Sequence, residues 1–212
     1  MPNQSKAIVL HSIKYGETSL IVNCFLYDIG VKSFIIKGVL NSKNKKFSKS
    51  YFLPLSIIYI DYFAKNNKDI GYIVEAKPAQ IFTSLHVDIF KSSVIIFISE
   101  LLNSVFKENP GSNKKLFEYL EYALIWYDKS TKEANFHLKV LADLTKFIGF
   151  YPNIKKESDK FFDLRLGTSS EVKPIENYIK DPELKKFKEL LGTNFEDLNS
   201  MKIDNLLRVK ML

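Results

Sequence analysis

The interval from Lys37 to Phe52 concentrates the residues that could bind a polyanion. It holds five lysines and three aromatic residues, and it contains no acidic residue. Its lysines are Lys37, Lys43, Lys45, Lys46 and Lys49. Lysine ammonium groups neutralise phosphates and release counterions, and aromatic rings stack on bases of any identity. We therefore expect these lysines to contact nucleic acid, whereas Phe52 fits better as a core residue of the following strand.

The residue types that usually carry catalysis form no recognisable constellation in this sequence. The three histidines are scattered and lack the short spacings of a metal site. Cys24 is the single cysteine and falls on the apolar side of a predicted strand, so we expect a buried thiol. Glu118 and Glu121 lie one helical turn apart, a spacing that is typical of a solvated helix face. We expect a binding protein with no catalytic residue, no cofactor and no metal.

The positive charge is concentrated at the N-terminal end of the chain. The 212 residues carry 31 basic and 24 acidic side chains, a formal net charge of +7. Residues 1–78 hold 11 lysines and 5 acids, whereas residues 79–212 hold 20 basic and 19 acidic residues. Only two basic residues are arginine, which disfavours sequence-specific reading of base edges. This distribution predicts a polyanionic partner for the first third alone, and the alternative is a lysine-rich composition with solvated surfaces.

Length and composition are those of an ordinary globular protein with one or two domains. The apolar run Val94–Ile98 has five residues, far short of the roughly 20 that a membrane span requires. The segment Met1–Lys6 lacks the apolar stretch of a signal peptide, and one cysteine cannot form an internal disulfide. We therefore expect a cytoplasmic protein.

The alternation of apolar residues predicts two domains of different secondary structure. In residues 1–78 the period is two, which predicts five short strands at about 7–11, 20–26, 31–37, 55–63 and 70–75. Several of these runs are apolar on both faces, which favours a small closed barrel over an open sheet.

From residue 79 onward the period becomes helical. In the first expected helix the residues facing the core are Val87, Phe90, Val94, Phe97, Leu101 and Val105. A second helix carries Leu116 to Tyr127 and a third carries Val140 to Ile148, whereas residues 150–174 are expected to be irregular apart from an extended piece at Phe161–Leu164. The sequence thus predicts an α+β protein, a five-stranded barrel followed by an α-helical domain of residues 79–212.

Six segments of the chain match the pattern of one protein family. They are Ala7–Ser12, Tyr15–Leu20, Lys37–Gly38, Leu53–Leu55, Leu144–Pro152 and Phe161–Arg165. Together they resemble RecO, a family of bacterial recombination and repair mediators, and the last two are similar to its Bacteroidetes-type branch. The resemblance covers about residues 1–165 and is most specific in the first 60.

The resemblance implies an OB-type barrel followed by a helical domain, and a DNA-binding, strand-annealing mediator of recombination in DNA repair. Members of the family bind single- and double-stranded DNA. With RecR they assist the loading of recombinase on single strands coated by single-strand-binding protein (SSB), without a covalent catalytic step. The implied location is the cytoplasm, in association with the nucleoid. The basic positions that match are Lys32, Lys37, Lys43, Lys46 and Lys49, and Lys45 joins them by its place in the loop.

Two features depart from the family pattern. Many members carry four cysteines after the third helix as a zinc module, but residues 150–174 contain none, so zinc is not expected here. Members also usually continue with another helical segment after the position that matches Leu207. We therefore expect a chain truncated at Leu212 and a second domain that is incompletely packed.

A docking site for the acidic, phenylalanine-ended tail of SSB is expected on the third helix. Lys139 and Lys146 are seven residues apart and share a helix face, so they could receive the carboxylates of such a tail. Phe136 and Phe150 lie near the two ends of the helix and could receive the aromatic ring. The alternative is that the phenylalanines belong to the core and the lysines are solvated.

Two other functions remain open from the residues alone. An OB-fold RNA-binding protein or RNA chaperone would have the same pattern, because contacts to the 2′-hydroxyl leave no sequence signature. An adaptor could instead recruit proteins through its helical domain, with the lysine-rich interval acting only as a soluble surface. Binding to matched DNA and RNA oligomers separates these hypotheses.

Overall fold

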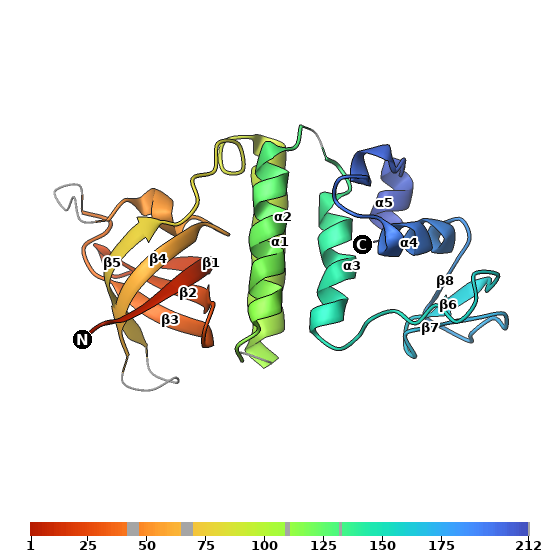
Figure 1. Ribbon diagram of the computed structural model, residues 1–212, viewed down its shortest axis with the longest axis horizontal. Helices are drawn as coiled ribbons and strands as arrows, with labels where there is room; N and C mark the ends of the chain where they lie inside the picture. Colours follow the sequence, from red (N-terminus) through yellow and green to blue (C-terminus); the bar gives the residue numbers. More distant parts are fainter. Residues whose placement is uncertain (42–46, 65–69, 109–110, 132, 212) are drawn as a thin grey trace. The chain divides into compact units, whose positions relative to one another are not determined.

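The computed structural model describes residues 1–212 apart from 42–46, 65–69, 109–110, 132 and 212 (Figure 1). The chain forms two compact units, residues 1–129 and residues 130–212. The first unit contains a β-barrel and two long helices, and the second contains three helices and a small sheet. The expected boundary at residue 78 follows the change from strands to helices, whereas packing groups the first two helices with the barrel.

The barrel is closed and five-stranded, as the sequence predicts. Its strands are β1 (Asn3–Tyr15), β2 (Ser19–Leu26), β3 (Gly30–Ile36), β4 (Ile57–Phe63) and β5 (Gly71–Pro78), in the order β1-β2-β3-β5-β4. Strand β1 is longer than expected because its first half pairs with β4 and its second half pairs with β2. The parallel pair β3–β5 closes the barrel on the other side.

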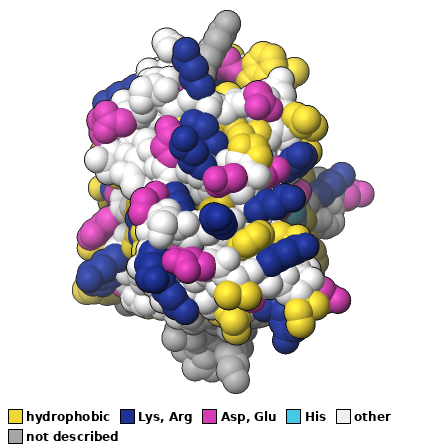
Figure 2. All heavy atoms as spheres, turned by 90° about the vertical axis from the view of Figure 1, so that its right-hand side faces the viewer, with side chains coloured by type: hydrophobic (Ala, Val, Ile, Leu, Met, Phe, Trp, Pro, Cys, Tyr) yellow, Lys and Arg dark blue, Asp and Glu magenta, His cyan; other side chains and the backbone are white. Residues whose placement is uncertain are grey.

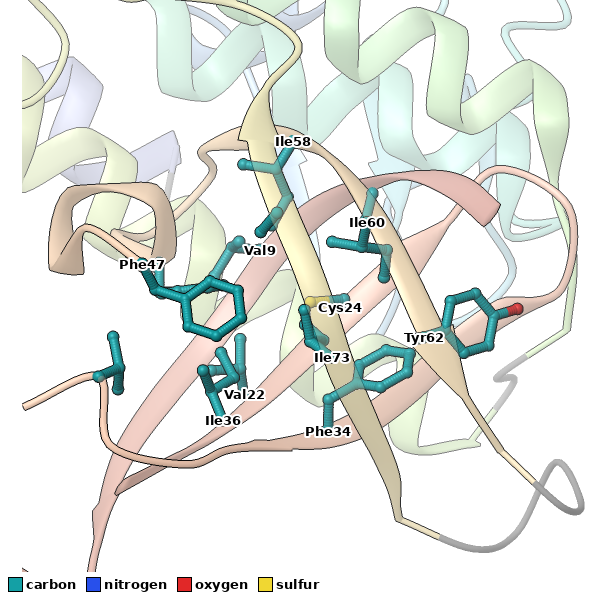
Figure 3. Packing of buried hydrophobic residues seen from close by; sticks show 14 of the residues in the cluster. Val9, Val22, Cys24, Phe34, Ile36, Phe47, Ile58, Ile60, Tyr62 and Ile73 are labelled. Carbon is teal, nitrogen blue, oxygen red and sulfur yellow. The ribbon is translucent and has the colours of Figure 1, made fainter. Parts of the chain in front are cut away.

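The interior of the barrel is filled by the inward residues of all five strands (Figure 3). They include Val9, Val22, Cys24, Phe34, Ile36, Ile58, Ile60, Tyr62 and Ile73. Cys24 is fully buried, and burial raises the pKa of its thiol to about 12, so it is not a nucleophile near neutral pH. Phe52, in the 3-10 helix η1 (Lys49–Phe52), belongs to the same core, as expected.

Closure of the barrel leaves no room for a side chain at Gly71. This residue pairs with Phe34 across β3 and β5. A Cβ atom at position 71 would lie 2.8 Å from the Phe34 ring and 2.9 Å from the carbonyl oxygen of Phe63. The close approach of β5 to β3 therefore requires glycine here.

Helices α1 (Ile89–Glu108) and α2 (Lys114–Lys129) cover the outer side of β1 and β2. The ring of Phe25, on the outer face of β2, lies 4.6 Å from that of Phe106 and 5.6 Å from that of Phe117, measured between centroids. Asn23 donates a hydrogen bond to Asn103 over 3.2 Å, and the Ser99 hydroxyl donates to the carbonyl of Leu10. The central part of β1, Ala7–Leu10, is consequently buried on both faces, the inner one in the barrel and the outer one beneath the helices.

The prediction of which side of α1 faces the core is wrong. Val87 and Phe90 are 83% and 79% exposed, and the buried side instead carries Lys91, Ile95, Ile98, Ser99, Leu102 and Phe106. Helix α1 is apolar around most of its circumference, so its periodicity does not select a face, and the barrel surface does. Over Ile89–Lys107 it is also long and apolar enough to cross a membrane, a property shared by core helices of soluble proteins.

The segment between the barrel and α1 is held by a buried carboxylate at the end of α2. The Asp128 side chain accepts hydrogen bonds from the backbone N–H groups of Thr83, Ser84 and Leu85 over 3.0, 2.7 and 2.9 Å. Lys91 donates to the Asp128 carbonyl over 2.9 Å. Burial alone would raise the pKa of Asp128, but the three backbone donors and the Ser84 hydroxyl lower it to about 2.

The second unit contains a small sheet, of which the sequence predicts one strand, the extended piece at Phe161–Leu164, but not its two partners. The elements of the second unit are α3 (Phe136–Phe147), β6 (Phe161–Asp163), β7 (Thr168–Ser170), β8 (Tyr178–Lys180), α4 (Glu183–Gly192), η2 (Leu198–Ser200) and α5 (Asn205–Met211). The strands pair in the order β7-β6-β8, so residues 150–174 are not irregular throughout. Phe162 packs on Phe187, and the Ser169 hydroxyl donates to the buried Asp159. Strands of three residues are too short to show a period of two.

We predict that Gly71→Ala destabilises the barrel by about 1–3 kcal/mol, because the added methyl group overpacks the β3–β5 junction. Urea unfolding followed by circular dichroism measures the change. Gly192→Ala is the matched control, because a Cβ there meets no described atom within 4 Å. Equal stability of the Gly71→Ala variant and the wild type would contradict the account of barrel closure.

The low pKa of Asp128 predicts a specific loss of stability in acid. Its folded pKa of about 2 lies below the ordinary 3.8, so its contribution is present above about pH 4 and lost as the pH falls toward 2. We expect Asp128→Asn to lower the free energy of unfolding by about 1–3 kcal/mol at pH 7, and the difference from wild type to shrink below pH 4. Asp197→Asn, at an exposed position, is the control. A difference that stays constant from pH 7 to pH 2 would contradict this assignment.

Candidate nucleic-acid interface

The lysine-rich interval is anchored to the barrel at both of its described ends. Phe47 and Phe52 pack into the barrel core, with their ring centroids 6.2 Å apart. Ser12 donates a hydrogen bond to the carbonyl of Phe52 over 2.7 Å. Within the interval, the described lysines Lys37 and Lys49 are exposed. These contacts fix residues 47–52 of the interval on the barrel.

Three of the expected DNA-binding lysines, Lys43, Lys45 and Lys46, lie outside the described residues. A fourth, Lys32, differs from the expectation. It is only 3% exposed and lies opposite Cys24 in the pairing of β3 with β2. The period of two along β3 places it on the same side as the buried Phe34, so it is not positioned to contact a phosphate at the surface. The expected surface role of Lys32 is therefore corrected to a buried one.

Lys37 leads to a second group of residues, on the outer face of β4 and β5. Its ammonium group lies 5.4 Å from the centre of the Tyr72 ring. Tyr72 on β5 is the cross-strand partner of Phe63 on β4, and the two side chains are 47% and 50% exposed. The next outward pairs along the two strands are Asp61 with Glu75 and Tyr59 with Lys77.

Tyr59 lies between two lysines at the other end of this face. Its cross-strand partners are Lys77 on β5 and Lys6 on β1. The ammonium group of each lysine lies 5.9 Å from the centre of the Tyr59 ring. Lys6 also forms an ion pair with Glu121 of α2. A shallow hollow of about 350 Å³ at this end is lined by Gln4, Ser5, Lys6, Tyr59, Ile60, Asp61 and Lys77.

We call these outward residues the β4–β5 face: Lys6, Tyr59, Asp61, Phe63, Tyr72, Glu75 and Lys77. The face was not among the residues expected from the sequence. A signal for it was present, because Tyr59 and Phe63 alternate with buried residues along β4. The partners on β1 and β5 become visible only when the strands are paired.

Glu118, Glu121 and His86 each contact another residue of the fold. Glu118 accepts a hydrogen bond from the Tyr27 hydroxyl over 2.8 Å, and Glu121 pairs with Lys6. A ring nitrogen of His86 lies 2.8 Å from the carbonyl oxygen of Pro54. Within the part of the chain that the structure describes, no three His, Cys, Asp or Glu side chains gather as a metal site would require. The expectation that the protein binds no zinc stays a prediction.

The two lysines expected to receive an SSB tail differ in their surroundings. Lys139 is buried, donates to Asp143 over 2.9 Å, and lies 3.4 Å from the carbonyl oxygen of Leu190. The prediction that Lys139 is exposed is therefore wrong, because α3 is buried on the side that faces α4. Lys146 is exposed, shares Asp143 over 2.8 Å, and lies 5.3 Å from the centre of the Tyr151 ring.

Phe136 and Phe150, the two rings expected near this site, also differ. Phe136 is fully buried and packs on Phe195, with their ring centroids 5.7 Å apart. Phe150 is exposed. An open hollow of about 450 Å³ beside it is lined by Tyr151, Pro152, Asn153, Ile154, Leu191 and Gly192. The end of α3, rather than its length, thus combines an exposed cation with exposed rings.

A closed five-stranded barrel joined to a helical region defines a protein with an OB-type N-terminal domain. Comparison with known families agrees with this class. Residues 1–82 match the family described as "Recombination protein O N terminal", and residues 86–211 match "Recombination protein O C terminal". The chain therefore belongs to the RecO family of DNA repair and recombination proteins.

Several relatives named "DNA repair protein RecO" align along nearly the whole chain. That of Flavobacterium psychrophilum is 38% identical over 94% of this chain and 83% of its own length. The Flavobacterium johnsoniae protein is 34% identical over 100% of this chain and 88% of its own length. The Bacteroides fragilis protein is 32% identical with the same coverage. These organisms agree with the Bacteroidetes-type resemblance of the C-terminal segments.

Proposed function

We propose that this protein is a DNA-binding and strand-annealing mediator of recombination, acting in DNA repair without a covalent catalytic step. The observation that carries the proposal is the coincidence of the RecO family match with an acid-free lysine interval anchored on an OB-type barrel. Lysine is a mobile point charge that suits phosphate backbones of any sequence. A mediator that acts wherever single strands arise needs this kind of sequence-independent binding.

Annealing by such a surface has a simple physical basis. Two complementary strands repel each other through their phosphates, and bound lysines neutralise part of that charge while releasing condensed counterions. Contacts limited to the backbone leave the base edges free to pair. The lysines that we propose for this role are Lys37, Lys43, Lys45, Lys46 and Lys49. Lys32 is not among them, because its side chain is buried.

We further propose that the protein works in the cytoplasm at the nucleoid, with RecR, on single strands coated by SSB, and assists recombinase loading there. The charge of residues 79–212 is close to neutral, so this region is better suited to protein partners than to DNA. Figure 2 views the chain from the right-hand side of Figure 1 and shows lysine and acidic side chains interspersed, with separate apolar patches. A mixed surface of this kind favours specific protein contacts over polyanion binding.

The end of α3 is the part of the second unit that best fits the acidic, aromatic-ended tail of SSB. Lys146 offers a partly exposed cation, and the hollow lined by Tyr151, Pro152 and Leu191 offers apolar walls for a ring. An aromatic anchor in a pocket beside a cation is the usual pattern for such peptides. Lys139 has no direct role in this proposal, because Asp143 holds it in the interior.

The first test of the proposed function is the salt dependence of DNA binding. Changing Lys43, Lys45, Lys46 and Lys49 together to Ala should weaken binding to single and double strands. It should also reduce the slope of log affinity against log salt by about 0.7–0.9 for each phosphate that is no longer neutralised. Fluorescence anisotropy from 50 to 300 mM salt measures both quantities, and an annealing assay with matched oligomers follows the same variants.

The matched control for this test is a quadruple Ala variant of Lys155, Lys160, Lys180 and Lys202, four exposed lysines of the second unit. It removes the same charge and should leave affinity and slope near wild type. An unchanged slope in the interval variant would contradict the proposed binding of phosphates. Binding to RNA with higher affinity than to matched DNA would favour the RNA-binding alternative, and no binding to either would favour an adaptor.

The second test concerns the SSB tail. We expect Lys146→Ala to weaken binding of a labelled acidic, phenylalanine-ended peptide by roughly three- to tenfold, because one charge-assisted hydrogen bond to the peptide can no longer form. Asp143 keeps its partner Lys139 in this variant, so the fold should be unaffected. Lys202→Ala is the control, and bare-strand DNA affinity should stay unchanged in both variants. Equal peptide affinity of the Lys146→Ala variant and wild type would exclude this site.

A further inference from the structure

We propose that the β4–β5 face is a second nucleic-acid site, which stacks the unpaired bases of a single strand on Tyr59, Phe63 and Tyr72. The inference rests on the proposed function and divides it between two surfaces. The lysine-rich interval binds phosphates of any nucleic acid, and the β4–β5 face selects strands whose bases are free.

The spacing of the three rings suits one extended strand. Tyr59 and Phe63 are four residues apart on β4, roughly 13 Å at about 3.3 Å per residue, and Tyr72 lies directly across from Phe63. Each ring is about half exposed at an outward position, with the remainder supported by the barrel. Rings held in this way can stack on bases without ordering a flexible side chain, and every base has a face that can stack.

The outer side of β2 is less accessible to a strand. OB-type barrels often bind oligonucleotides across their second and third strands. Here the outer side of β2 is occupied by the helices, since Phe25 stacks on Phe106 and Asn23 bonds to Asn103. The β4–β5 face meets α2 only at its Lys6 end, through the ion pair with Glu121, among the contacts of the described residues, and its three aromatic side chains stay about half exposed.

The charges on the face discriminate between single strands and duplexes. Lys6 and Lys77 flank Tyr59 at one end and Lys37 lies beside Tyr72 at the other, whereas Asp61 and Glu75 oppose each other between them. A duplex turns its phosphates outward and would bring them against these carboxylates. A single strand can turn its bases to the rings and leave its phosphates to the lysines at the two ends.

The central carboxylates also have suitable partners on bases. Carboxylate oxygens accept hydrogen bonds from exocyclic amino groups, such as the N4 amino group of cytosine. Thymine has no such amino group. The face should therefore favour oligo(dC) over oligo(dT) of equal length, and Asp61→Asn with Glu75→Gln should reduce that preference.

The test uses the full chain with Tyr59→Ala, Phe63→Ala and Tyr72→Ala combined. Loss of base stacking should weaken single-strand affinity at least about tenfold, while duplex affinity and the salt slope stay near wild type, because every lysine that meets a phosphate is retained. Tyr15→Ala, which removes a similarly exposed ring of the barrel outside this face, is the control. The variant Tyr59→Phe, which keeps the stacking ring, should bind single strands like wild type.

A probe that reports stacking directly makes the result independent of affinity. At saturation, the wild-type protein should quench the fluorescence of an oligomer that carries 2-aminopurine. The triple variant should quench this fluorescence much less. Thermal unfolding of each variant establishes that the barrel is folded. If it is not, the single variants Tyr59→Ala and Tyr72→Ala provide the same comparison.

The outcomes separate this inference from the proposed function. Selective loss of single-strand affinity and quenching supports it. Unchanged single-strand binding in the triple variant, with wild-type binding intact, overturns it and leaves the face as a protein contact. A parallel loss on single strands and duplexes with a lower salt slope also overturns it. Wild-type protein that binds neither form contradicts the proposed function itself.

Discussion

The central part of strand β1, Ala7–Leu10, is buried on both faces, and the organisation of the first unit depends on this double burial. Its inward residues Ala7 and Val9 belong to the barrel core, while Ile8 and Leu10 lie on the opposite side and are equally inaccessible. Two packed layers are needed to cover such a strand, and α1 and α2 provide the second one. The helices are therefore part of the structure that keeps the barrel closed, which explains why they form one compact unit with it.

This packing determines which parts of the barrel can meet nucleic acid. The helices cover the outer side of β2 at Asn23 and Phe25, whereas the aromatic side chains of β4 and β5 and the described lysines Lys37 and Lys49 stay exposed. The interval supplies charge and the β4–β5 face supplies rings, so the two surfaces differ in chemistry as well as in position. Phosphate neutralisation is sensitive to salt and indifferent to strandedness, whereas stacking requires unpaired bases. A protein that holds one strand while offering it to a complement can use both.

The barrel and its interior were predictable from the sequence, because alternation along β2, β3 and β4 shows directly which residues are inward. The same alternation places Lys32 inside the barrel, because it lies two residues before the inward Phe34. Helix α1 could not be oriented, since it is apolar on nearly every side and only the shape of the barrel selects its buried face. In the second unit the extended piece at β6 was predicted, whereas its partners β7 and β8 were missed because they are only three residues long.

The functional site was predictable only where its residues are consecutive. The lysine-rich interval is visible in the sequence as five lysines without an acid. The β4–β5 face joins residues of three strands, and the Asp128 hydrogen bonds join positions more than 40 residues apart, so both depend on pairings that a single sequence does not display. For Lys139, in contrast, the sequence pattern led to a wrong prediction. Its spacing from Lys146 suggested a shared surface, but burial and Asp143 turn it into part of the core.

The central claim is that nucleic acid binds the side of the barrel that the helices leave open. Hydrogen–deuterium exchange of the full chain, with and without a saturating single-stranded oligomer, tests it directly. Slow-exchanging amides of the two helices serve as an internal reference in the same sample. The account predicts new protection in peptides from the lysine-rich interval and from β4 and β5, with no change in α1, α2 or the second unit. Protection confined to α1 and α2, or to residues 130–212, would contradict it.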